Sequence, residues 1–289
     1  MAVNTQTVYP ALSDVTAAFE RVYPPEWAAS WDAVGLVVGD PAQPVTRILF
    51  AVDPVDAVVD EALDWGADLI ITHHPLMLRG VTSVAADTPK GRIVHRLIRA
   101  GTALYTAHTN ADTAFPGVSD ALARAVGLAG PLRPLDADTT DPEGRRGIGR
   151  IGELGEPTPL REFAGQVARG LPATAAGIRV AGDPDRLVTT VAVSGGAGDS
   201  LLGAARAAGV DVFVTSDLRH HPASEFIEDH GGPALIDTAH FASEWPWLND
   251  GARRLEEELA GAAGSDGANV EIRVSTTVTD PWSQVVPHL

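Results

Sequence analysis

Short apolar runs alternate with amphipathic segments along the chain, and this alternation predicts layered α/β structure. Runs bounded by Gly, Pro and Asp predict strands at Arg47–Val52, Asp68–Thr72 and Ala103–Ala107. Between them, apolar residues recur at three- and four-residue spacing in Ala57–Trp65 and Gly91–Ala100, the period of a helix with one buried face. The resulting strand-helix-strand-helix-strand order is typical of α/β folds.

The same order of elements occurs twice. The segment ALDWGADLIITHHP (62–75) resembles ARAAGVDVFVTSDLRHHP (205–222), and IRAGTALYTAHTNAD (98–112) resembles EDHGGPALIDTAHFASE (228–244). We infer an α/β protein with two related lobes, each a mixed sheet flanked by helices. In each lobe we expect histidines at the carboxyl ends of the strands, where α/β sheets bind their ligands.

The boundaries of the lobes follow from composition. Arg133–Arg146 (RPLDADTTDPEGRR) is rich in Pro, Asp, Thr and Gly, which indicates an exposed connection. We therefore expect an N-terminal lobe at 1–130, a connection at 131–146 and a C-terminal lobe at 147–289, with the two lobes interlocked. Within the second lobe, VEIRVSTTV (270–278) alternates as a strand.

Composition excludes several classes of protein. No apolar run reaches the ~18 to 20 residues of a membrane span, and no basic segment precedes an apolar one at the N-terminus, so we expect a cytoplasmic protein without membrane partners. The net charge of -17, with a single lysine, opposes nucleic-acid binding, which needs cations along the phosphates. The absence of cysteine excludes disulfides, thiolate catalysis and sulfur-ligated zinc.

Histidines carry the clearest chemical signal. Six of the nine follow apolar strands, namely His73, His74, His108, His220, His221 and His240. A single histidine after a strand is most often structural, but six at equivalent ends of two repeats favour a shared site. Carboxylates accompany them at Asp112, Asp217 and Glu244. Imidazole with carboxylate and without thiolate suits zinc, manganese, iron or nickel, and a bridging carboxylate permits two ions about 3.5 to 4 Å apart.

The adjacent pair His73 and His74 raises a geometric question, because neighbouring residues of an extended strand point to opposite faces. The two imidazoles can share one cluster only where the strand ends and the chain turns. Pro75 indicates such a turn.

Two glycine-rich motifs allow other interpretations. Gly147–Gly152 (GIGRIG) matches G-x-G-x-x-G, but no strand precedes it, so dinucleotide binding is disfavoured. Ser194–Ser200 (SGGAGDS) follows a predicted strand at Val188–Val193 and opens a helix. It is explained equally well as an anion site or as a tight turn.

Taken together and in order, the motifs WDAVGLVVGD, ITHHPL, AHTNAD, GIGRIG, VSGGAG, TSDLRHH and DTAHFASE span nearly the whole chain. In this combination the sequence resembles the GTP cyclohydrolase I type 2 homologs, also called the dinuclear-metal-centre or NGG-interacting-factor-three-like family. It is similar to the shorter form, without the domain that some relatives insert. One position departs from the family pattern Trp-Asp-Asn-x-Gly-Leu, since Ala33 replaces the asparagine, and this puts any role of that loop in doubt.

The resemblance implies a metal site between the lobes and a toroidal homohexamer. It implies two divalent ions with five ligands at His73, His74, Asp112, His240 and Glu244, and Glu244 would bridge the ions. His108, Asp217, His220 and His221 match other motif positions and would line the site. We expect the catalytic proton transfers to involve His221, Asp217 and His108.

Two functions remain open at this point. The first is a metal-dependent hydrolase of the GTP cyclohydrolase kind, acting on a small molecule such as a nucleotide, whose phosphates Arg79, Arg92, Arg96 or Arg219 would contact. The second is a non-enzymatic metal-binding or regulatory assembly protein. The sequence does not separate them, because one fold supports many chemistries.

Overall fold

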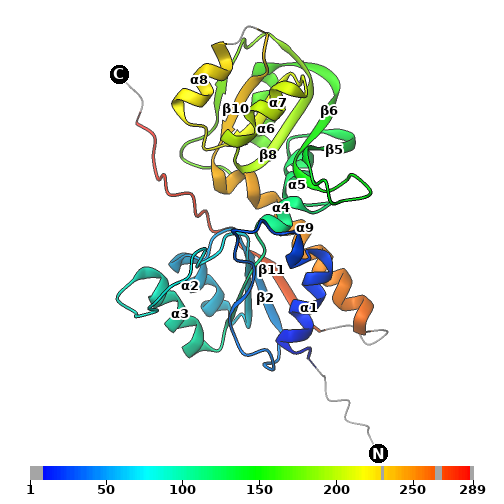
Figure 1. The fold of residues 1–289 in the computed structure, drawn as a ribbon. Coiled ribbons are helices and arrows are strands. Elements are labelled where there is room, and N and C mark those ends of the chain that lie inside the picture. The colour runs from blue at the N-terminus through cyan, green and yellow to red at the C-terminus, as the bar shows by residue number, and fades with distance from the viewer. Residues whose placement is uncertain (1–8, 229–230, 264–268, 287–289) are drawn as a thin grey trace, which may run out of the picture. The chain divides into compact units, whose positions relative to one another are not determined.

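Two mixed β-sheets, each flanked by helices, form the cores of the protein (Figure 1). The computed structural model describes residues 9–228, 231–263 and 269–286. The chain divides into two compact units: unit 1 is Met1–Ala111 with Leu248–Thr279, and unit 2 is Asp112–Trp247 with Asp280–Leu289. Each unit consists of two separate segments of the chain. Helix α9 (His240–Ala263) begins in unit 2 and ends in unit 1.

Unit 1 contains a five-stranded sheet in the order β1-β4-β3-β2-β11. Strands β4, β3, β2 and β11 pair in parallel, and β1 pairs antiparallel with β4. Helices α2 and α3 lie on one side of the sheet, and α1 lies on the other (Figure 1). The bounds of these elements are α1 (Leu12–Val22), η1 (Pro25–Trp27), β1 (Gly35–Val38), β2 (Arg47–Ala51), α2 (Asp56–Trp65), β3 (Leu69–Thr72), α3 (Pro89–Ala100), β4 (Ala103–Thr106), α4 (Thr109–Thr113) and β11 (Glu271–Val274).

The parallel strands of unit 1 are apolar throughout because both faces of the sheet are covered. On one face, Leu49 and Ile70 pack into a cluster with residues of α2 and α3. On the other, Phe50 meets Phe19 of α1 with ring centroids 5.7 Å apart. Full burial of each such side chain stabilises the fold by about 1.5–3 kcal/mol.

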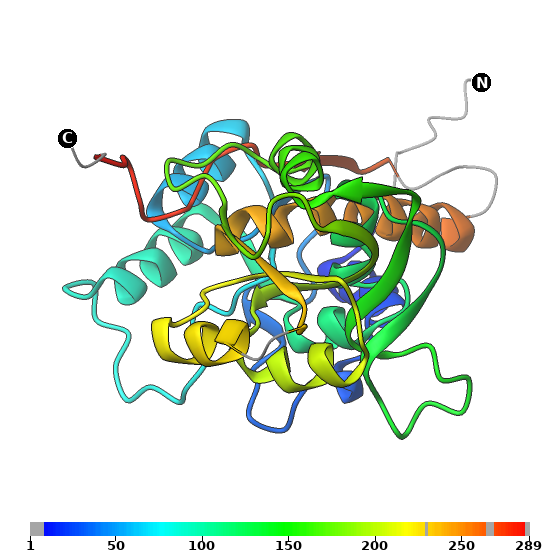
Figure 2. The same cartoon turned by 90° about the horizontal axis from the view of Figure 1, so that it is seen from above.

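Unit 2 contains a six-stranded sheet in the order β5-β6-β8-β9-β10-β7, in which β8, β9 and β10 are parallel. Figure 2 shows α7 and α8 on one side of this sheet and α6 on the other. On the first side, Phe213, Phe226 and Leu235 belong to one buried cluster. The bounds of these elements are α5 (Val118–Ala125), β5 (Ala129–Ala137), β6 (Gly147–Pro159), α6 (Leu160–Gly170), β7 (Arg179–Ala181), β8 (Leu187–Ala197), η2 (Asp199–Leu201), α7 (Leu202–Ala207), β9 (Val212–Ser216), α8 (His220–Glu228) and β10 (Ala234–Thr238).

Equivalent contacts recur in the two sheets. Gly39 and Gly182 both have positive φ, at 138° and 136°, and a Cβ added to them would lie 2.7 Å from Cβ of Ala103 and 2.8 Å from Cβ of Ala234, respectively.

The aspartates before the central strands also match. Asp68 accepts a hydrogen bond from the backbone of Thr46 at 2.7 Å, and Asp211 accepts one from Thr189 at 2.9 Å. Both glycines and both threonines belong to a repeated Gly-Asp-Pro-x-x-x-Val-Thr motif at 39–46 and 182–189.

The expected strands and helices of unit 1 are confirmed with small shifts of their ends, and β11 is the strand expected within 270–278. It pairs with β2 in the sheet of unit 1, whereas from the sequence we expected this segment in the C-terminal lobe. The segment 131–146 contains more regular structure than expected, because most of β5 lies within it, ahead of the turn into β6. GIGRIG runs along β6, which agrees with the alternation of its apolar residues. Among the described residues, no helix has the length and apolar character needed to cross a membrane.

Candidate metal centre

Three imidazoles meet at the carboxyl ends of β3 and β4 in unit 1. His73 and His74 follow β3, and His108 follows β4, which is its parallel neighbour. One ring nitrogen from each of the three lies within 4.8 Å of the others. We call these residues the three-histidine cluster.

The end of β3 explains how two adjacent histidines share this cluster. The backbone N–H groups of His73 and His74 still donate to Ala51 and Val52, at 3.1 and 2.9 Å. The hydroxyl of Thr72 donates to the carbonyl oxygen of His74 at 2.9 Å, which closes a turn where regular pairing stops. The two rings then come within 5.1 Å of each other, measured between centroids.

Each imidazole of the cluster is held through its Nδ1 atom. His73 donates to the carbonyl oxygen of Ala107 at 3.0 Å, and His74 donates to Oδ1 of Asp53 at 2.7 Å. His108 donates to Oδ1 of Asp32 at 2.9 Å. Carbonyl and ionised carboxylate oxygens only accept, so the proton of each neutral ring sits on Nδ1 and the lone pair sits on Nε2. This is the arrangement of metal-ligating histidines, whose second nitrogen donates to an outer acceptor.

Asp32 is the most firmly held of these acceptors. Its side chain is inaccessible to solvent and also accepts the backbone N–H of Thr109 at 2.9 Å. Burial opposes ionisation, but the hydrogen bonds from His108 and Thr109 outweigh it and hold the pKa of Asp32 far below its usual range. Asp32 therefore stays ionised, and its carboxylate orients the ring of His108. Ala33 donates its backbone N–H to Oδ1 of Asp32 at 2.7 Å.

Unit 2 supplies a second group at the start of α9. His240 donates from Nδ1 to Oδ2 of Asp217 at 2.7 Å, and its Nε2 lies 3.1 Å from Oε1 of Glu244, one helical turn later. Glu244 is almost completely buried. We call these two residues the His240–Glu244 pair. Ligand atoms of one tetrahedral ion with bonds of about 2.0–2.1 Å lie roughly 3.3 Å apart, so this spacing suits a shared ion.

The glycine motif at the end of β8 makes room for this pair. Gly196 has φ of 70°, and a Cβ there would lie 2.6 Å from Oε1 of Glu244 and 3.2 Å from Nε2 of His240. Its backbone N–H donates to Oγ of Ser243 at 2.9 Å. A close approach of the backbone to the two side chains thus accounts for a glycine that the sequence explained only as a turn or an anion site.

The remaining predicted site residues lie as follows. Asp112 is half-buried in α4, four positions after His108. His220 and His221 are exposed at the start of α8. In the part of the chain that the structure describes, neither they nor Asp112 joins a group of three converging ligand atoms. The roles assigned to these residues from the sequence stay predictions.

Three of the four arginines considered for phosphate contacts are paired with carboxylates. Arg92 lies 3.8 Å and Arg96 3.0 Å from Asp56, and Arg219 pairs with Asp199. Such pairing reduces the positive charge that these side chains could offer to a phosphate.

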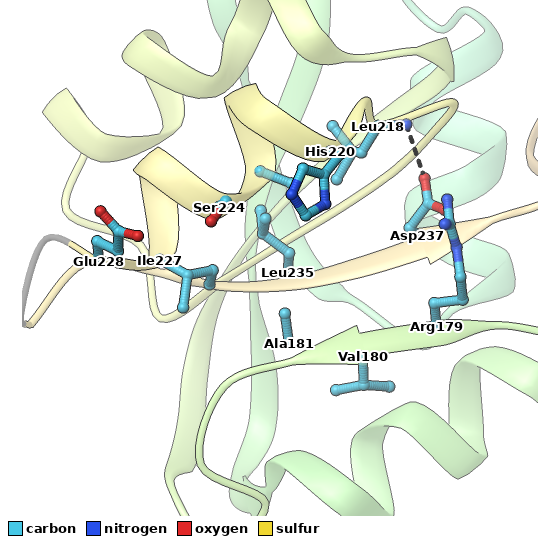
Figure 3. Close-up of a pocket in the computed structure, with 11 residues that line it drawn as sticks. Arg179, Val180, Ala181, Leu218, His220, Ser224, Ile227, Glu228, Leu235 and Asp237 are labelled. Carbon is cyan, nitrogen blue, oxygen red and sulfur yellow. Dashed lines mark hydrogen bonds and ion pairs between the residues drawn. The ribbon is translucent and has the colours of Figure 1, made fainter.

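A pocket of about 440 Å³ opens in unit 2 between β7, β10 and α8 (Figure 3). Its lining is mostly apolar, with Leu218 and Leu235 among its residues, and polar groups stand at its edges. There Arg179 donates from Nε to Oδ2 of Asp237 at 2.8 Å, and Asp237 also accepts the backbone N–H of Leu218 at 3.0 Å. The volume is in the range of sites for small molecules.

The donor set fits a divalent metal. It consists of imidazole Nε2 atoms with fixed tautomers and a buried carboxylate, without thiolate, and this chemistry suits zinc, manganese, iron or nickel. The sequence suggested Asp32 as an aspartate near the site but not as the acceptor of His108, and it did not suggest Asp53 at all; the two lie 76 and 21 positions from their histidines. The one available signal was that Asp53 directly follows a predicted strand.

Known proteins resemble this chain over almost its whole length. A GTP cyclohydrolase 1 type 2 homolog of Streptomyces coelicolor is 59% identical over 274 residues, covering 95% of this chain and 94% of that protein. A protein of the same description from Mycobacterium tuberculosis is 39% identical over a 375-residue alignment that covers 94% of this chain and 96% of its own. That alignment is longer than this chain, in agreement with the expected shorter form.

The fold is shared with solved structures. The crystal structure of a Bacillus cereus protein related to NIF3 superposes with a TM-score of 0.87 at 26% identity, covering 96% of this chain and all of the other. Residues 10–281 match the sequence profile of the family Duf34/NIF3 (NGG1p interacting factor 3). The chain therefore belongs to the Duf34/NIF3 family.

Proposed function

We propose that this protein binds two divalent metal ions and hydrolyses a small-molecule substrate with them. The observation that carries the proposal is the shared anchoring of four histidines. His73, His74, His108 and His240 each donate from Nδ1 to a fixed oxygen and so present Nε2 as a ligand. Four imidazoles set in this way are difficult to explain by packing alone.

We propose that the three-histidine cluster and the His240–Glu244 pair serve the same two ions, with Asp112 as a further ligand and Glu244 as the bridge. Two ions with at least four ligands each need more donors than either group supplies. The chain passes from one unit to the other after Ala111 and after Trp247, three residues beyond His108 and three beyond Glu244. This connectivity supports the proposal that both groups hold the same two ions.

The ions would supply Lewis acidity and a bound water of lowered pKa. The residues of the chain then have separate tasks. Asp53 and Asp32 hold the protons of His74 and His108 on Nδ1, which keeps the opposite nitrogens available. His221 is exposed and can exchange protons with solvent, so we assign it the transfer to the leaving group.

We propose that the organic part of the substrate binds in the pocket lined by Leu218. This pocket is apolar, of suitable size, and its wall residue Leu218 directly follows Asp217, the partner of His240. A compact organic molecule with few charges fits it better than a triphosphate. The paired states of Arg92, Arg96 and Arg219 point in the same direction. The names of the relatives suggest GTP as the first substrate to test.

A second candidate is a metal-binding protein without turnover, in which the ions support assembly, for example as the hexamer expected from the family. The pairing of the arginines favours it as well, because these side chains have carboxylate partners inside the protein. The two candidates differ in a single observable, which is multiple turnover.

The test combines metal content with activity. Protein purified without added metal is analysed by inductively coupled plasma mass spectrometry and assayed on compact uncharged esters and amides as well as on GTP and simple phosphate esters. The proposal expects about two ions per chain and turnover that is lost in His74→Ala but kept in His95→Ala, a histidine of α3 outside both groups. Two ions without turnover on any substrate would favour the second candidate, and no metal would refute both.

A further inference from the structure

Asp217 has an unusual backbone conformation. Its φ is 56°, in the left-handed region, and it is the one non-glycine with positive φ among the described residues, where fourteen glycines take such angles. For a residue with a Cβ this conformation is costly, and it persists only when the surroundings impose it. A glycine would be the ordinary choice here, so the aspartate needs another explanation.

The neighbours of Asp217 impose the conformation from both sides. Ser216 is the buried last residue of β9. On the other side, the backbone N–H of Leu218 donates to Oδ1 of Asp237 at 3.0 Å (Figure 3). The backbone N–H of Arg219 donates to Asp199 at 3.2 Å. The side chain of Leu218 is buried in the unit 2 cluster. The chain therefore turns at Asp217 to connect buried Ser216 with the hydrogen-bonded backbone of Leu218 and Arg219.

Packing does not explain why position 217 carries an aspartate. The carboxylate of Asp217 is 56% exposed, so burial contributes little to keeping it there. Its contact is with His240, whose Nδ1 donates to Oδ2 at 2.7 Å. The left-handed turn is what aims the carboxylate at this ring.

We propose that Asp217 is a positioning residue whose strained backbone fixes the tautomer and orientation of His240, so that Nε2 faces Oε1 of Glu244. This inference rests on the proposed function, because orienting His240 is useful only if the ring binds a metal ion. The tautomer and orientation of His240 can nevertheless be measured in the metal-free protein. It replaces the proton-transfer role expected for Asp217 from the sequence, since a carboxylate engaged on Nδ1 orients the ring from outside.

Three substitutions separate the backbone from the carboxylate. Asp217→Asn keeps an acceptor oxygen and a side chain that tolerates positive φ. Asp217→Gly relieves the strain and removes the acceptor, whereas Asp217→Ala removes the acceptor and keeps the strain. Asp185→Gly is a matched control in an exposed turn of the same unit.

The first measurement needs no metal. Nitrogen-15 chemical shifts of His240 in the metal-free protein should show a proton on Nδ1 in wild type and Asp217→Asn, and partial loss of the proton from Nδ1 in the Gly and Ala variants. A wild-type ring without a proton on Nδ1, or a Gly variant whose Nδ1 stays protonated as in wild type, would overturn the inference.

The second measurement is cobalt(II) binding followed by its visible absorption, with thermal unfolding in parallel. Asp217→Gly should keep or raise the melting temperature while its cobalt affinity falls by about 10–100-fold, the usual effect of losing an outer partner of a ligating histidine. Asp217→Asn should restore most of the affinity, and Asp185→Gly should bind as wild type. If wild type binds no cobalt, the proposed function fails whatever the tautomer. If wild type binds it and Asp217→Gly binds it equally, only the present inference fails.

Discussion

Replacing Gly196 by alanine tests the geometry of the His240–Glu244 pair. The new Cβ would lie 2.6 Å from Oε1 of Glu244, whereas ordinary contact begins near 3.4 Å, so the two groups must separate by about 0.8 Å. Glu244 is almost fully buried, and the clashing atom is at the end of its side chain, so we expect the carboxylate rather than the backbone to move. A shift of this size is larger than the tolerance of a preorganised site, which is about 0.5 Å.

The expected effect has two parts. Alanine at a φ of 70° is strained by about 1–2 kcal/mol, and this part appears as lower stability. Displacement of Glu244 should weaken metal binding by about 10–100-fold, by analogy with other changes that disturb ligand orientation. Isothermal titration with zinc measures the second part, and urea unfolding of the metal-free protein measures the first.

Gly209→Ala is the matched control for Gly196→Ala. Gly209 has φ of 67°, but a Cβ there would meet nothing within 4 Å. It should therefore show the same backbone strain without any change in metal affinity. Wild-type zinc affinity in Gly196→Ala would refute the assignment of Glu244 and His240 as ligands.

Three further outcomes follow from other parts of the structure. Arg150 and Asp120 form a fully buried ion pair at 2.9 Å, so Arg150→Met should destabilise the protein by about 3–5 kcal/mol in urea unfolding, and adding Asp120→Asn should recover part of the loss. No recovery would show that the other contacts of Arg150 dominate. Gly39→Ala and Gly182→Ala should destabilise by similar amounts, because each Cβ meets an alanine Cβ at 2.7 or 2.8 Å, and a large inequality would contradict the equivalence of the two sheets. The pKa of Asp32 is lowered in the folded state, so its contribution to stability is complete above the unfolded pKa of about 3.9 and is lost as the pH falls below it. The difference in stability between wild type and Asp32→Asn should accordingly be constant above about pH 5 and shrink in acid, and a difference that grows in acid would contradict the sign.

Much of the fold could be predicted because the central parallel strands are buried on both faces. Their apolar runs, such as Arg47–Ala51, stand out from the helices beside them. The two edge strands of the unit 2 sheet were missed, although β11, at an edge of the unit 1 sheet, was expected. β5 contains Pro131 and Pro134, which an edge strand tolerates because one side of its backbone has no partner strand, and the same prolines suggested a connection. β7 has only three residues, too few for a pattern.

The candidate site was predictable in part for a related reason. Histidines at strand ends are visible in the sequence, since the strands are. Asp32 and Asp217 could be placed near the site, but their roles as acceptors of His108 and His240 could not be predicted. Asp32 is distant from His108 in the chain, and the direction of the Asp217 side chain depends on a positive φ. Gly196 looked like a turn residue, and its contact with Glu244 exists only in the folded chain.

The central claim is that the anchored imidazoles bind a pair of divalent ions through Nε2. Crystals grown with zinc or manganese and measured at the absorption edge of the metal test it most directly. The account predicts two anomalous peaks per chain about 3.5 to 4 Å apart, bonded to Nε2 of His73, His74, His108 and His240 and bridged by Glu244. Peaks bonded through Nδ1, or peaks absent from these side chains in fully loaded crystals, would contradict it.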